Sequence, residues 1–154
     1  MMLSNKFRAF TLLESLVVIL LTTSFILLPV LQTKGLAKRF ENNDFYTQIN
    51  ENLPKLQELC IQRRAEGKVI NQGKSIVFSV KGQIEESLTI IVPDDIRVWF
   101  TASGDNGALI EEITFNKLGN NSSFPRIYFE DRYQSRTIIY VFQLYRGKFH
   151  VRYA

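Results

Sequence analysis

The chain has 154 residues, of which 19 are Lys or Arg and 15 are Asp or Glu, so its formal net charge is +4. This length suits one small domain, and this charge excludes a strongly polycationic nucleic-acid binder of the kind that composition alone would reveal. The single cysteine, Cys60, excludes an intrachain disulfide, so the core must be held by packing.

An almost wholly apolar stretch runs from Phe10 to Leu31 and is interrupted by one charge, Glu14. As a helix it would be roughly 33 Å long, close to the ~30 Å hydrocarbon core of a bilayer, and this length predicts a membrane-spanning segment. A carboxylate in such a helix is costly and usually marks a function. If the chain began at Phe10, Glu14 would lie in the first helical turns, where the ammonium terminus of a neighbouring chain could pair with it.

The sequence A-F-T-L-L-E at residues 9–14, with Lys6 and Arg8 before it, resembles the N-terminal motif of type IV pilins and pseudopilins. The resemblance implies that a prepilin peptidase cuts between Ala9 and Phe10 and methylates the new terminus. It also implies that Phe10 and Glu14 act in filament assembly, with major and other minor pseudopilins as partners. Most members of the family have Gly where Ala9 stands, and Ala is typical of small pseudopilins from Gram-positive competence systems, which serve DNA uptake in transformation.

This interpretation divides the chain into a leader at residues 1–9, a transmembrane and filament-core helix at residues 10–37, and a soluble domain at residues 38–154. The expected localisation is a single-pass membrane protein with its soluble domain outside, and a pilus after assembly. Three alternatives stay open. The chain could be a pseudopilin of a type II secretion-like system, a membrane-anchored binding module, or a secreted domain cleaved after Gly35-Leu36-Ala37.

Pro29 lies deep in the apolar stretch and removes one backbone hydrogen bond, so a kink is expected there. The kink is either merely tolerated or softens the helix for packing in a filament, and the resemblance favours the second interpretation.

Residues 38–66 predict a continuing, now amphipathic helix that ends near Gly67. Pro54 should bend or restart it. Cys60 is expected to be a buried small hydrophobe. Apolar residues recur at spacings of three and four and share one helical face: Phe45, Ile49, Leu53, Leu56 and Cys60.

After Gly67 the pattern changes to short β-rich runs with tight turns, about seven in number. The expected fold is therefore α+β, with the long N-terminal helix packed on one small, meandering antiparallel sheet, as in pilins. The expected strands are residues 74–80, 87–92, 96–102, 109–116, 127–129, 137–145 and 148–153.

Two C-terminal passages extend the resemblance weakly. The F-x-x-x-G pattern of residues 115–119, followed by a short strand, is similar to minor pseudopilins, as is the closing hairpin around Arg146-Gly147. Gly is frequent in the family where Tyr145 and Arg126 stand, so the subtype is less defined.

No catalytic constellation emerges, and no cofactor or metal is expected. The lone His150 lies in an expected terminal strand, and Asp94-Asp95 after Pro93 is typical of a turn. Glu111 and Glu112 are adjacent in a strand and face opposite ways. The chain is therefore predicted to be the substrate of an enzyme and not an enzyme.

Basic and aromatic residues interleave near the C-terminus, and such residues can bind phosphates and stack on bases. Alternating strand faces, with aromatic residues inward and charges outward, explain the same pattern. If DNA contact occurs, the candidate residues are Arg146, Lys148 and Arg152.

Overall fold

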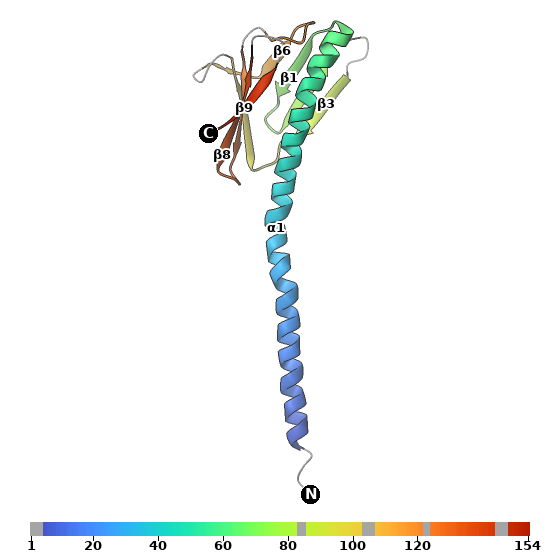
Figure 1. Ribbon diagram of the computed structural model, residues 1–154, viewed down its shortest axis with the longest axis vertical. Coiled ribbons are helices and arrows are strands. Elements are labelled where there is room, and N and C mark those ends of the chain that lie inside the picture. Colours follow the sequence, from blue (N-terminus) through green and yellow to red (C-terminus); the bar gives the residue numbers. More distant parts are fainter. Residues whose placement is uncertain (1–4, 83–85, 103–106, 122–123, 144–147) are drawn as a thin grey trace. The chain divides into compact units, whose positions relative to one another are not determined.

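The computed structural model describes residues 5–82, 86–102, 107–121, 124–143 and 148–154, but not the side chains of residues 5–11, 28–34 and Glu86. The chain divides into two compact units, residues 1–40 and residues 41–154. One helix, α1 (Asn5–Arg63), contributes to both units and has 59 residues, so the expected long N-terminal helix is present (Figure 1).

In the first unit, the described side chains are those of residues 12–27 and 35–40, and Glu14 and several hydroxyl residues lie among the apolar ones. No helix in the described part of the chain is long and apolar enough to cross a membrane. The expected transmembrane segment at residues 10–37 and the single-pass membrane localisation are contradicted by this finding.

In the second unit, two antiparallel sheets replace the one small sheet that was expected. The first has the order β3-β2-β1-β6 and the second has the order β5-β4-β7-β8-β9. The strands are β1 (Gly67–Asn71), β2 (Ser75–Val80), β3 (Glu86–Ile91), β4 (Ile96–Thr101), β5 (Leu109–Ile110), β6 (Glu112–Phe115), β7 (Arg126–Asp131), β8 (Arg136–Phe142) and β9 (Phe149–Tyr153).

The single meander was wrong because the chain changes sheet after β3. A turn at Pro93-Asp94-Asp95, closed by the Ile96 N–H donating to the Pro93 carbonyl at 2.9 Å, leads β4 away from β3. β4 then pairs with β5 and β7, and β6 returns to pair with β1. The β1 strand was not expected at all, and the expected strand at residues 109–116 is divided between β5 and β6.

The predicted apolar face of the helix is confirmed within this unit. Phe45, Ile49, Leu53, Leu56 and Cys60 are all buried in a core that both sheets share. The ring of Phe45 packs edge-on against Phe129 of β7, with 5.6 Å between centroids. The helix therefore supplies one wall of the core, and the expected amphipathic pattern identified that wall correctly.

Helix α1 continues through Pro54 and ends at Arg63, before the expected Gly67. Arg64 has a φ of +50°, which is the left-handed backbone conformation common just after a helix. The Ala65 N–H donates to the Cys60 carbonyl at 3.1 Å and closes the last turn. Gly67 instead begins β1, where an added Cβ would lie 2.5 Å from the Cys60 Sγ. The glycine thus permits the close approach of helix and strand.

Candidate assembly surface

The expected processing and assembly residues all lie in α1. Glu14 is described and exposed to solvent. The backbone of Ala9, Phe10 and Pro29 is helical, but their side chains lie outside the described residues, so the kink expected at Pro29 is not described.

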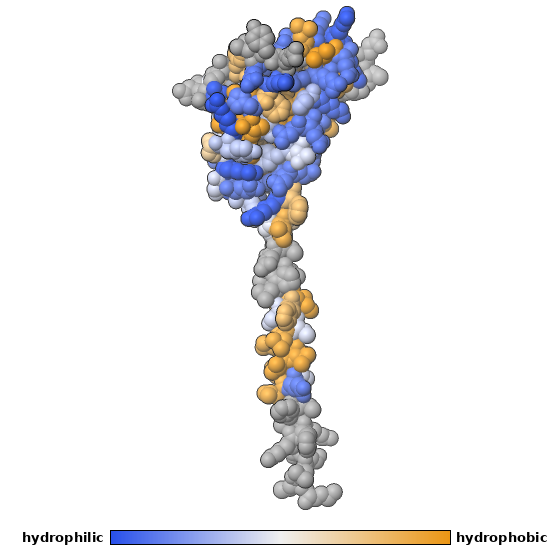
Figure 2. Space-filling model, in the orientation of Figure 1, coloured by the Kyte–Doolittle hydropathy of each residue, from blue (hydrophilic) through white to orange (hydrophobic). Residues whose placement is uncertain are grey.

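Residues 12–27 of α1 form what we call the apolar segment. Its large side chains have between 49% and 76% of their surface exposed, a high value for apolar residues. They surround the helix and do not form a single stripe, as the consecutive run from Leu16 to Leu21 requires. Figure 2 shows these apolar side chains along the helix. The large apolar residues of the segment are Leu12, Leu13, Leu16, Val17, Val18, Ile19, Leu20, Leu21, Phe25, Ile26 and Leu27.

Hydroxyl groups in this segment are bonded back to the helix itself. Ser15 Oγ donates to the Leu12 carbonyl at 2.9 Å, and Ser24 Oγ donates to the Leu20 carbonyl at 2.7 Å. The hydroxyls of Thr22 and Thr23 donate to carbonyls three and four residues earlier. Since these donors are satisfied internally, an apolar partner could cover them without leaving unpaired polar groups.

Glu14 is the exception on this surface. Covering an ionised carboxylate with apolar groups is unfavourable unless a cation pairs with it. An apolar helix that carries one carboxylate near its start therefore favours a partner that is apolar along its length and cationic at one point.

Two of the three candidate DNA-contact residues are described, and both are exposed: Lys148 and Arg152. Arg146 lies outside the described residues. Arg152 Nε donates to His150 Nε2 at 3.2 Å, and both side chains lie on the same face of β9. On the other face of β9, Phe149 packs against Tyr140 and Phe142. Direct DNA contact stays a prediction.

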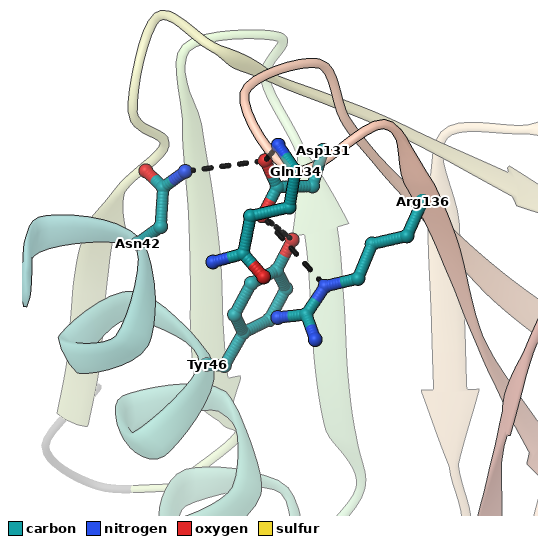
Figure 3. Close-up of polar contacts among 5 residues, drawn as sticks. All are labelled: Asn42, Tyr46, Asp131, Gln134 and Arg136. Atoms are coloured by element: carbon teal, nitrogen blue, oxygen red, sulfur yellow. Dashed lines mark hydrogen bonds and ion pairs between the residues drawn. The ribbon is translucent and has the colours of Figure 1, made fainter. Parts of the chain in front are cut away.

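A buried polar cluster that the sequence did not predict lies between α1 and the β7–β8 turn (Figure 3). Its centre is the carboxylate of Asp131, which has no exposed surface. Asn42 Nδ2 donates to Asp131 Oδ1 at 3.3 Å, and the Gln134 N–H donates to the same oxygen at 2.9 Å. The Tyr46 hydroxyl and Arg136 Nε lie 3.5 Å and 4.0 Å from Oδ2.

The polar groups of this cluster hold one another in place through hydrogen bonds. Burial, and then the nearby Asp131 carboxylate, raise the pKa of Tyr46, so its hydroxyl stays protonated and keeps donating. The described residues contain no group of acidic, His or Cys side chains that could hold a metal ion. A signal for Asn42 was present in the sequence, since it lies three residues before Phe45 on the same helical face. Nothing in the sequence pattern pointed to Asp131 as its partner.

Comparisons of the chain with family models, with curated proteins and with solved structures found no match.

Proposed function

We propose that the chain is a minor pseudopilin, a structural subunit of a competence pseudopilus that serves DNA uptake. The observation that carries the proposal is the motif at residues 9–14, which overlaps the start of the apolar segment, whose side chains are exposed on all sides. Such a surface calls for other apolar helices around it. In this proposal the chain is a substrate of prepilin peptidase and catalyses no reaction itself.

The mechanism follows from the charges near the start of α1. Cleavage between Ala9 and Phe10 creates a cationic terminus at Phe10. Attraction between this terminus and Glu14 of a neighbouring subunit is stronger among packed apolar helices than in water, although desolvation offsets part of it. The pairing relieves the cost of covering Glu14 and sets the axial register between subunits.

The test is the N-terminus of the mature protein, determined by mass spectrometry on protein isolated from the cells that make it. We expect a chain that begins at a methylated Phe10. A chain that retains Met1, or one that begins at Lys38, would overturn the proposal.

Ala9 favours a competence system over a secretion system, because Ala before the cut resembles the small competence pseudopilins. Deletion of the gene should therefore abolish transformation and leave protein secretion unchanged. A secretion defect with normal transformation would assign the subunit to the other system.

A further inference from the structure

Strand β3 is an edge of the first sheet, and in the described residues its only strand partner is β2 (Figure 1). The Val92 N–H, just after β3, donates to the Lys74 carbonyl at 2.9 Å and so points toward β2. Because backbone groups alternate along an antiparallel strand, those of Ser87, Thr89 and Ile91 point away from β2. This side of β3 offers donors and acceptors to another strand.

The usual protection of an edge strand is confined to the two ends of β3, with Glu86 as its first residue and Pro93 two residues after its end. Between them, residues 87–92 contain no charge and no proline, whereas natural edge strands commonly carry one or the other. Leu88 and Ile91 also expose 43% and 78% of their surface. An uncharged run at an edge, with exposed apolar side chains, is suited to pairing with a further strand.

A groove runs between β3 and the flank of α1, formed by two hollows of about 360 Å³ each that share Gln48. The charged side chains that line its two ends differ in sign. Glu41 and Asp44 lie at the end that Ile91 lines, and Lys55 lies at the end that Ser87 and Leu88 line. All three charged side chains are exposed.

We propose that β3 pairs antiparallel with β3 of a second copy of this chain and joins the two four-stranded sheets. A two-fold axis through the centre of the paired strands, at Thr89, places Ile91 of one copy beside Ser87 of the other. Lys55 of each copy then faces the acidic end of the other groove. This charge complementarity favours a second copy as the occupant, and the inference does not depend on the proposed function.

Cysteine cross-linking of the full-length chain tests the pairing directly. In a β3–β3 pair, Thr89 of one copy lies beside Thr89 of the other, so the Thr89→Cys variant should form a disulfide-linked dimer under mild oxidation. The matched control is Thr114→Cys, an exposed threonine on β6, the opposite edge of the same sheet. The unmodified chain, with its buried Cys60, reports the background. Equal cross-linking of the Thr89→Cys and Thr114→Cys variants would overturn the proposal.

A proline distinguishes backbone pairing from simple proximity. In the Thr89→Cys background, Ile91→Pro removes an outward N–H and leaves the bonds to β2 in place. We expect it to abolish the cross-link, whereas Ile91→Val should retain it, with circular dichroism checking that both variants fold. A folded Ile91→Pro variant that cross-links as before would contradict strand pairing.

A charge exchange on α1 tests the two-fold arrangement without changing β3 itself. It still tests the pairing of the two copies if the proline variant does not fold. In the Thr89→Cys background, Lys55→Glu should slow cross-linking severalfold, because like charges then meet. Adding Asp44→Lys should restore the rate. If the double variant is no faster than Lys55→Glu alone, the proposed orientation is wrong.

Discussion

At the scale of single residues, the buried carboxylate of Asp131 connects α1 to the turn after β7. A carboxylate with no exposed surface is tolerable only because donors from two parts of the chain surround it. Asn42 and Tyr46 come from α1, and Gln134 from the turn after β7. The cluster therefore fixes the position of this part of the helix against the β7–β8 turn, in addition to the apolar contacts nearby.

We expect Asp131→Ala to lower the free energy of unfolding by about 3 kcal/mol, because it leaves buried donors without an acceptor. Urea unfolding followed by circular dichroism measures the change. The matched control is Glu130→Ala, which removes only a surface ion pair with Arg97 at 3.6 Å and should cost less than about 1 kcal/mol. Equal losses in the two variants would show that the cluster is not important for stability.

Gly119 provides a second prediction at this scale. Its φ is +71°, and an added Cβ would lie 3.0 Å from the Gln57 carbonyl oxygen of α1. Gly73 has a similar φ of +82°, but an added Cβ there would have nothing within 4 Å. Alanine at either position should cost about 1 kcal/mol for the left-handed backbone, and Gly119→Ala about 1 kcal/mol more for the contact with α1. Thermal or urea unfolding of the two variants would measure that difference. If Gly73→Ala were as unstable as Gly119→Ala, or less stable, the prediction would be wrong.

At the scale of elements, a hydrogen bond beside the apolar core joins α1 to β8. The hydroxyl of Tyr140 donates to Asn50 Oδ1 at 2.8 Å, and only 1% of the Tyr140 side chain is exposed. Burial is the main cause that raises the pKa of Tyr140 to about 12. The neutral phenol is therefore part of the folded state.

This shift predicts a loss of stability in alkali. Unfolded tyrosine ionises near pH 10, so above that pH the unfolded state loses a proton that the folded state keeps. The free energy of unfolding should fall as the pH rises from about 10 toward 12, by about 1 kcal/mol at pH 11 from this residue. In Tyr140→Phe the alkaline decrease between pH 9 and pH 11 should be smaller by that amount. Identical pH profiles of the two proteins would exclude the linkage.

At the scale of the whole molecule, the chain combines a core-forming unit at residues 41–154 with an exposed apolar segment at residues 12–27. The first has its own core, and the second has exposed apolar side chains that suit contacts with other chains.

Filament incorporation gives the prediction at this scale. Glu14→Gln keeps the size of the side chain but removes the charge that would pair with a neighbour's terminus. We expect this variant to accumulate and to be cleaved after Ala9, yet to be lost from isolated filaments. The control is Glu51→Gln, which changes another exposed acidic residue of α1 and should be incorporated normally. Quantitative immunoblots of the filaments compare the two variants, and incorporation of Glu14→Gln at the wild-type level would exclude the proposed pairing.

The sequence by itself determined the elements that depend on local periodicity. The long helix, its buried face from Phe45 to Cys60 and most strands were predictable, because side-chain spacing alone sets which residues share a face. The predicted turn at Asp94-Asp95 was also confirmed. These features need only neighbours a few residues apart.

The tertiary structure decided what depends on residues far apart in the chain. The division into two sheets follows from the pairing of β1 with β6 and of β4 with β7, and no strand pattern encodes its distant partner. The expectation of a membrane span rested on length and hydropathy, and it did not hold for the described helix. The Asp131 cluster joins residues 85 and 89 positions apart, a contact that only the folded core creates. An unpaired polar group costs much more free energy when it is buried, so these contacts matter for stability only once the whole fold has buried them.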